Sequence, residues 1–403
     1  MKNCGLFSFG LMNYNQLGKI RTKKNNNNDN NEDDLITIPK KILLPKTILK
    51  IKKISCGSNH TLILSEEGKI FSFGSSKFIG RNNNPLKIYQ ISHIKENITN
   101  ISTGKYFSIA YNKYSIYFWG LIFYNESIQN HCEYEKFPKK IYFKKYLNFN
   151  KNKFIKKIIC GSNHCLILTN KGKIFSFGDN SYGQKNLDPF YYNNNNNLNI
   201  NKFIITDVDD IFTGNNHSFC IQIIDKKKIL KSWGKNNYGQ LGNNSICDSF
   251  IPKKVVFKEY KCILNNNNNI EIEKIIGGEN FSVCLTKDKK IFFWGKNDNN
   301  NNNFNIIKVP KLIYYFNNKE IEDIINGDNF FYCISNIKNK IYSWGEDDNY
   351  LLGDKNIEKK TKITVVVQKF FKNKKIEKMD FGESFGIVYL NQKNKINNNN
   401  NNK

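Results

Sequence analysis

Hydrophobic and polar residues alternate along this chain in short runs that recur. The run HTLIL from His60, the polar turn SEEGK and the run IFSFG ending at Gly74 predict two strands joined by a tight turn. Nearly the same text, HCLIL, TNKGK and IFSFG, ends at Gly178. Before each such pair comes a third apolar stretch, such as IKKIS or IKKII, and earlier still a Pro followed three residues later by Ile or Val, as at Pro39 and Pro138. Each unit therefore has up to four short strands and nothing that must be helical.

Two glycines mark every repeat unit. One follows the apolar approach and opens a GxxH or GxxF turn, at Gly57, Gly104, Gly161, Gly214, Gly278, Gly327 and Gly382. The other ends a strand in FG or WG, at Gly10, Gly74, Gly120, Gly178, Gly234, Gly295 and Gly345. Within a unit the two glycines lie 16 to 20 residues apart, whereas whole units vary from 46 to 64 residues because runs of Asn fall between them. Such runs are typical of surface loops that tolerate insertion.

Seven repeats of short strands predict an all-β fold, a seven-bladed β-propeller. The chain begins with the second half of a unit, CGLFSFG, and ends with a first half, FGESFGIVYL from Phe381 to Leu390. Neither half buries its hydrophobic face alone, so we expect pairing of the N- and C-terminal strands to close the ring. An open solenoid would need capping repeats instead. We therefore assign residues 1–392 to a single propeller and residues 393–403 to a disordered Asn-rich tail.

Composition changes this picture little. The net charge of +27 over 403 residues would ordinarily indicate a polyanionic partner. Only Arg21 and Arg81 of the 62 basic residues are arginine, however, and Asn, Ile, Phe and Tyr are also enriched. This pattern indicates AT-rich codon bias over the whole chain, and lysine lacks the bidentate fork with which arginine binds phosphate.

The ten cysteines contain no CxxC pair, which indicates a reducing compartment, nucleus or cytoplasm. The apolar start is too short for a signal peptide and repeats text found downstream. No segment approaches the ~20 apolar residues of a membrane helix. We predict an intracellular monomer without a membrane segment.

The repeat resembles that of the regulator of chromosome condensation family. The resemblance rests on the GxxH turns, the WG or FG strand ends and the text that follows them, GLMNYNQLG from Gly10, GDNSYGQ from Gly178 and GKNNYGQLG from Gly234. It covers nearly the whole chain. The founding member of the family is a chromatin-bound guanine nucleotide exchange factor for the small GTPase Ran, and the resemblance implies that loop residues on one propeller face, acids in the GxxH turns above all, would do this work.

The turns depart from that family pattern. Those that keep His carry Ser or Asn, whereas the acids Glu279 and Asp328 lie in turns that have Phe in its place. The hairpin wedge of the exchange factor is not recognisable either. The acids are thus only partly matched.

Comparison between units separates packing from chemistry. His60, His164 and His217 stand where other units have Phe, which neither binds a metal nor acts as a base, so a packed ring is expected. Three cysteines replace small apolar residues, at Cys220, Cys284 and Cys333. The four tryptophans stand where other units have Phe, which favours packing between blades over a base-stacking platform. GESFG from Gly382 resembles a nucleophile elbow, but a strand rather than a helix follows it. We predict no catalytic residue, no metal and no cofactor.

The loop face is the remaining candidate. The two residues after each turn glycine are polar or charged in nearly every unit, which fits either ordinary turn chemistry or a partner-binding arc that is acidic on one side. If it is a binding arc, the partner-binding residues are Asn59, Lys105, Asn163, Asn216, Glu279, Asp328 and Glu383.

Two functional hypotheses follow. The favoured one is a non-catalytic propeller scaffold that binds protein partners through its loop face. The alternative is a guanine nucleotide exchange factor for a Ran-like small GTPase, associated with chromatin, so that nucleic acid would be a further partner.

Overall fold

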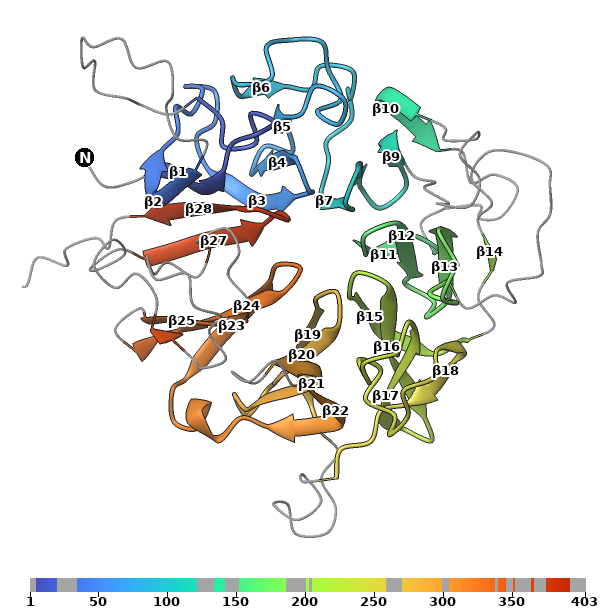
Figure 1. Cartoon of the computed structure of the whole chain (residues 1–403). Helices are drawn as coiled ribbons and strands as arrows, with labels where there is room; N and C mark the ends of the chain where they lie inside the picture. Colours follow the sequence, from blue (N-terminus) through green and yellow to red (C-terminus); the bar gives the residue numbers. More distant parts are fainter. Residues whose placement is uncertain are drawn as a thin grey trace, which may run out of the picture.

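The computed structural model describes residues 5–19, 35–121, 134–141, 152–185, 201–202, 205–258, 270–298, 304–337, 340–345, 351, 364–365 and 375–391. Its described strands form seven four-stranded antiparallel sheets. Figure 1 shows the sheets arranged as blades around a central axis, in the order of the chain. The predicted seven-bladed β-propeller is confirmed.

Six blades are each formed by one continuous stretch of the chain. Their strands are named in order from the innermost, beside the axis, to the outermost. Blade 1 holds β3 (Ile51–Cys56), β4 (His60–Ser65), β5 (Ile70–Gly74) and β6 (Tyr89–Gln90). Blade 2 holds β7 (Asn100–Thr103), β8 (Phe107–Tyr111), β9 (Ile116–Leu121) and β10 (Tyr134–Ile141). Blade 3 holds β11 (Ile155–Cys160), β12 (His164–Thr169), β13 (Ile174–Gly178) and β14 (Asn201–Lys202).

The second half of the ring repeats this order. Blade 4 holds β15 (Val208–Thr213), β16 (His217–Ile224), β17 (Lys227–Gly234) and β18 (Ser249–Lys254). Blade 5 holds β19 (Ile272–Gly277), β20 (Phe281–Thr286), β21 (Ile291–Asp298) and β22 (Phe304–Leu312). Blade 6 holds β23 (Ile321–Asn326), β24 (Phe330–Ser335), β25 (Lys340–Gly345) and β26 (Thr364–Val365), and a 3-10 turn, η1 (Tyr314–Phe316), precedes it.

Blade 7 joins the two ends of the chain. Its strand order is β2 (Leu35–Lys41), β1 (Gly5–Leu11), β28 (Phe385–Asn391) and β27 (Lys375–Phe381). β1 pairs with β28 from Gly5 opposite Leu390 to Gly10 opposite Phe385. The predicted closure by terminal strands is therefore confirmed, and the tail assigned to residues 393–403 lies outside the described residues.

Two sequence signals explain the blade. The turn glycine leaves room for an aromatic ring, because a Cβ on Gly57 would lie 2.2 Å from Cε1 of His60. Proline falls in the outermost strand, as Pro39 in β2 and Pro138 in β10 do, where a missing N–H breaks no ladder. The hydrophobic cores lie between neighbouring blades, as where residues of β8 and β9 pack against β11 to β13.

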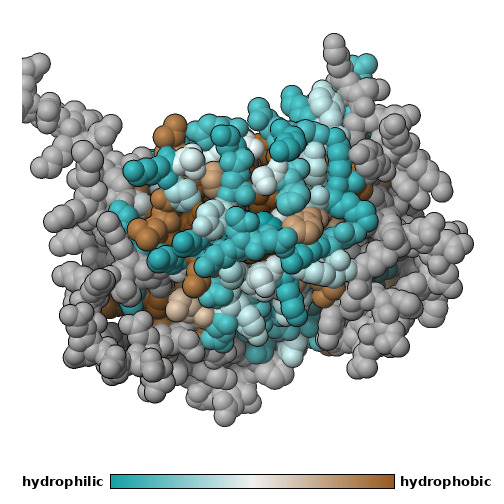
Figure 2. All heavy atoms as spheres, turned by 90° about the horizontal axis from the view of Figure 1, so that it is seen from above, coloured by the Kyte–Doolittle hydropathy of each residue, from teal (hydrophilic) through white to brown (hydrophobic). Residues whose placement is uncertain are grey.

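The described surface on the side of the ring that Figure 2 shows is largely hydrophilic. Figure 2 shows the molecule edge-on, with hydrophilic residues over most of the described surface and smaller hydrophobic areas between them. Exposed large apolar side chains include Ile38 on β2, Tyr89 on β6 and Tyr134 on β10. No described helix has the length and apolar character of a membrane span.

Candidate functional site

The seven innermost strands surround a central channel with a volume near 1080 Å³. The GxxH and GxxF turns follow these strands, so all seven turns lie at the same mouth of the channel. We call this ring of turns the rim. Six of its seven turns contribute lining residues to the channel, from Gly57 and Ser58 in blade 1 to Gly382 and Glu383 in blade 7.

Backbone hydrogen bonds join neighbouring turns of the rim. The amide of Ser58 donates to the carbonyl of Lys105 at 2.9 Å, and the amide of Lys105 donates to the carbonyl of Ser162 at 2.8 Å. The series continues through Asn215 and reaches the turn of blade 6, where the amide of Glu279 donates to Asp328 O at 2.7 Å. A binding surface formed by the rim is therefore held in place from blade to blade.

Side chains also bridge the rim across intervening blades. Lys105 Nζ of blade 2 lies 3.1 Å from Glu383 Oε1 of blade 7, and Ser58 of blade 1, between them, donates to Glu383 Oε2 at 2.7 Å. Asn215 Nδ2 of blade 4 donates to Asp328 Oδ1 of blade 6 at 2.9 Å. We call these five residues the rim cluster.

Burial and neighbouring charges shift the pKa values of two residues in the rim cluster. Burial raises the pKa of Asp328, although the hydrogen bond from Asn215 and the charge of Lys105 oppose the rise. Burial alone would lower the pKa of Lys105, but the carboxylate of Glu383 outweighs it, so the pKa of Lys105 is raised. Lys105 stays charged, and the Glu383 side chain, 43% exposed, remains reachable by a partner.

The predicted partner-binding residues divide into two groups on the rim. Lys105, Asp328 and Glu383 meet in the rim cluster, and Glu279 Oε1 lies 3.8 Å from Lys235 Nζ. The asparagines instead stand at the second turn position, where their carbonyls accept hydrogen bonds from the residue after each strand-ending glycine, as Asn59 O does from Ser75 N. Asn163 and Asn216 make the same bond. Their partner-binding role stays a prediction.

Two residues of the rim cluster were not among the predicted partner-binding residues. Ser58 and Asn215 occupy the first turn position, the same position as Lys105, Asp328 and Glu383. Comparing that one position through all seven units would have picked out both. The sequence signal was therefore present, but neither residue is charged.

The three histidines of the turns are packing residues. All are fully buried, and each Nε2 reaches a serine of the next blade: Ser108 for His60, Ser218 for His164 and Ser282 for His217, at 2.8 to 2.9 Å. The hydroxyl of Ser218 donates to Gln184 O and that of Ser282 to Gln240 O, so both accept from the imidazole. The imidazoles of His164 and His217 therefore carry a proton on Nε2, and burial, which lowers the pKa of each to about 3, keeps them neutral.

Stability should fall in mild acid because of these histidines. Burial lowers the pKa of each to about 3, from 6.5. The unfolded chain therefore binds more protons between these two pH values, and the free energy of unfolding drops as pH falls through that window. Asp380 has the opposite effect on stability, because its pKa is raised to about 6 and its protonation favours the folded chain as the pH falls. It is one group against three histidines. In a triple variant, His60, His164 and His217 are changed to Phe, the residue of the other blades. This variant should lose most of the slope of the free energy of unfolding against pH, measured by urea unfolding at several pH values. An unchanged slope would contradict this assignment.

Tryptophan and cysteine also take the predicted packing roles. The indole N–H of Trp233 donates to Gln184 O and that of Trp294 to Gln240 O, each at 2.8 Å, so each joins its blade to the preceding one. Cys220 is fully buried, and burial raises the pKa of its thiol to about 12. Ser384 is followed directly by β28, so the elbow-like text does not form a strand, turn and helix.

Comparison with known proteins is consistent with this architecture. The family model described as RCC1-like domain matches residues 5–388. The guanine nucleotide exchange factor SRM1 of Saccharomyces cerevisiae is 26% identical over 298 residues, 63% of this chain and 58% of that protein. The serine/threonine-protein kinase Nek9 of Xenopus laevis is 28% identical over 165 residues, 39% of this chain and 15% of that protein. The chain thus spans less than two thirds of the length of these curated relatives.

Solved structures share the fold. Prp20p from Saccharomyces cerevisiae superposes with a TM-score of 0.80 at 20% identity, covering 98% of this chain and 93% of that one. Human WBSCR16 gives a TM-score of 0.74 at 16% identity, covering 96% and 98%. Both likenesses extend over the complete ring.

Proposed function

Because this chain belongs to the family of RCC1-like domains, we propose that it is a protein-binding scaffold that holds its partner on the rim. The partner would contact Lys105, Glu279 and Glu383 directly, and Asn59, Asn163, Asn216 and Asp328 would complete the surface. Binding needs no bond-making step, and the working compartment would be the nucleus or the cytoplasm.

One observation carries this proposal: the rim is a preorganised polar surface. Its turns are joined by backbone hydrogen bonds, and the Lys105–Glu383 pair and the Asn215–Asp328 bond hold charged groups in place before any partner arrives. Preorganised groups lose little conformational entropy on binding. The exposed carboxylates of Glu279 and Glu383 flank the more buried Asp328, which suits a partner with a basic segment.

Exchange of guanine nucleotides is the second candidate. SRM1 is named as a guanine nucleotide exchange factor, and the structure of Prp20p is described together with its binding to Gsp1p and histones. Prp20p shares the propeller fold with this chain, and SRM1 matches the chain in sequence over 298 residues. A Ran-like GTPase and histones are therefore the partners to test first, and release of nucleotide would turn the scaffold into an exchange factor.

Removing two charges of the rim should weaken partner binding but leave folding intact. We expect a chain with Lys105→Met and Glu383→Gln to bind a Ran-like GTPase or histones at least about tenfold more weakly than the unchanged chain, because two charge-assisted contacts are lost. Affinity is measured by calorimetry. The control, Lys139→Met with Glu135→Gln, removes an ion pair from the outer strand β10 and should bind normally.

Nucleotide release separates the two candidates. The scaffold function is supported if this chain binds the GTPase through the rim but the GTPase releases a fluorescent nucleotide no faster than it does alone. Accelerated release that the rim variant loses supports exchange activity instead. Equal binding by the rim variant and the control would contradict both.

A further inference from the structure

A second ring of polar residues lies deeper in the channel. Its members stand four residues before each turn glycine and are Lys53, Asn100, Lys157, Asp210, Lys274, Asp323 and Lys378. Six of the seven line the channel, all except Asn100. This channel ring alternates between a lysine and a hydrogen-bond acceptor as the blades follow one another.

Each lysine of the first six blades reaches forward to the acceptor of the next blade. Lys157 Nζ lies 2.8 Å from Asp210 Oδ1, and Lys274 Nζ lies 2.7 Å from Asp323 Oδ1. Lys53 Nζ donates to Asn100 Oδ1 at 3.0 Å and to the carbonyl of Ile101 at 2.8 Å. Each of the three acceptors of the ring is therefore paired with one lysine.

Seven is an odd number, so the alternation fails at one junction. The blade after Lys378 is blade 1, and the position that should offer Lys378 an acceptor holds Lys53 instead. Lys378 is exposed to the channel, and within the described part of the chain no carboxylate lies within ion-pair distance of its ammonium group. Two lysines thus occupy equivalent positions at the junction of β27 and β3, with no acid between them in the ring.

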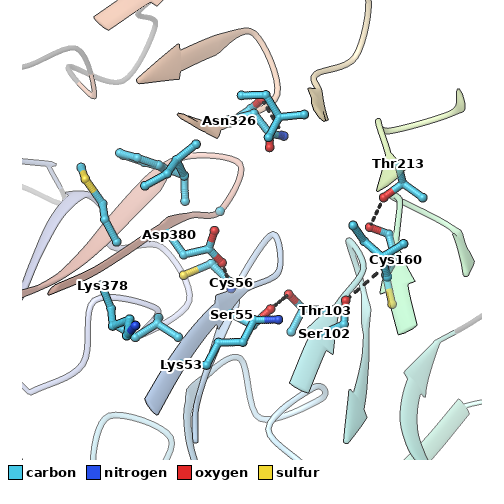
Figure 3. Close-up of a pocket in the computed structure, with 18 of the residues that line it drawn as sticks. Lys53, Ser55, Cys56, Ser102, Thr103, Cys160, Thr213, Asn326, Lys378 and Asp380 are labelled. Atoms are coloured by element: carbon cyan, nitrogen blue, oxygen red, sulfur yellow. Dashed lines mark hydrogen bonds between the residues drawn. The ribbon is translucent and has the colours of Figure 1, made fainter. Parts of the chain in front are cut away.

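Polar groups between blades 1 and 2 lie next to this junction. Lys53 has three N–H bonds and gives two of them to Asn100 and Ile101, which leaves one for a ligand. The hydroxyl groups of Ser55 and Thr103 lie 2.8 Å apart on the same wall. Figure 3 shows Lys53, Ser55 and Thr103 beside one another, with Lys378 and Asp380 on the adjacent strand.

One carboxylate opposes an anion here. Asp380 stands two residues after Lys378 and accepts the amide proton of Cys56 at 2.7 Å. Among the described residues, Asp380 forms an ion pair with neither Lys378 nor Lys53, although its charge opposes the lowering of the Lys53 pKa by burial. Its charge lowers the affinity for an anion but leaves both lysines available.

We propose that the channel binds an inorganic dianion of the phosphate type between Lys378 of β27 and Lys53 of β3. The two ammonium groups supply charge from two blades, and the channel supplies ample space. Such an ion would neutralise the one junction of the ring that the protein leaves with two like charges, so binding should also stabilise the closure between blades 7 and 1.

The direct test titrates the full chain with inorganic phosphate in a calorimeter at constant ionic strength. We expect one saturable site, weakened at least about tenfold by Lys378→Met because a charge-assisted contact is lost. The matched control is Lys253→Met, which removes an exposed lysine from the outermost strand β18, away from the channel lining. Absence of a saturable site, or equal weakening by both variants, would overturn the proposal.

The pH dependence gives an independent test with sulfate, which stays a dianion throughout the range. Burial raises the pKa of Asp380 to about 6 and lowers that of Lys53 to about 8. Other groups that act on these two are Lys157, Lys274, Cys56 and Cys160. Sulfate should bind more tightly below pH 6 than at pH 7, and Asp380→Asn should remove this difference. A difference that survives in Asp380→Asn would contradict the placement of the ion beside Asp380.

Discussion

Replacing Trp294 by Ala is expected to lower the free energy of unfolding by about 3–5 kcal/mol, as for other fully buried large aromatic side chains. Trp294 is fully buried in blade 5, its ring lies 6.0 Å from that of Phe219 in blade 4, and its indole N–H donates to Gln240 O at 2.8 Å. The substitution removes both the packing and the hydrogen bond that join two blades. Urea unfolding measures the loss.

Trp294→Phe is the matched control. Phe already fills the equivalent position in three other units, and the carbonyl of Gln240 would still accept from the hydroxyl of Ser282 at 2.8 Å. We expect this variant to lose about 1–2 kcal/mol, from one hydrogen bond and a smaller ring. A Phe variant as unstable as the Ala variant would show that the hydrogen bond, not inter-blade packing, dominates at this position.

Local patterns in the sequence were sufficient to predict the fold. Hairpins such as HTLIL with IFSFG form from alternation and turn residues alone, and both signals are contained within one unit. Comparing seven copies then identified His60 and Trp294 as packing residues, because Phe replaces each elsewhere. Closure followed from the two half units at the chain ends.

The candidate site depended on information that no single unit holds. Lys105 and Glu383 are 278 residues apart and belong to blades that are not neighbours, so their contact follows from the width of the channel mouth. The bond from Asn215 to Asp328 likewise crosses blade 5. The sequence identified the turn positions, whereas the pairs between them required the closed ring.

Removing β28 is expected to destroy cooperative unfolding. This strand lies between β1 and β27 in blade 7, so a chain that ends at Ser384 leaves β27 without a partner and β1 paired with β2 alone. It also loses Phe385, Ile387, Val388 and Leu390, which are fully buried. Because each blade packs against the next, an open ring exposes the hydrophobic faces of blades 1 and 6 as well. The matched control ends at Asn391 and keeps every described strand.

The most direct measurement is urea unfolding of both shortened chains beside the full one, followed by tryptophan fluorescence and circular dichroism. The chain that ends at Asn391 should unfold in one sharp transition at the midpoint of the full chain. The chain that ends at Ser384 should give a broad, early change in which the two signals do not coincide. A sharp, coincident transition at an unchanged midpoint for the chain that ends at Ser384 would contradict a propeller closed by β1 and β28.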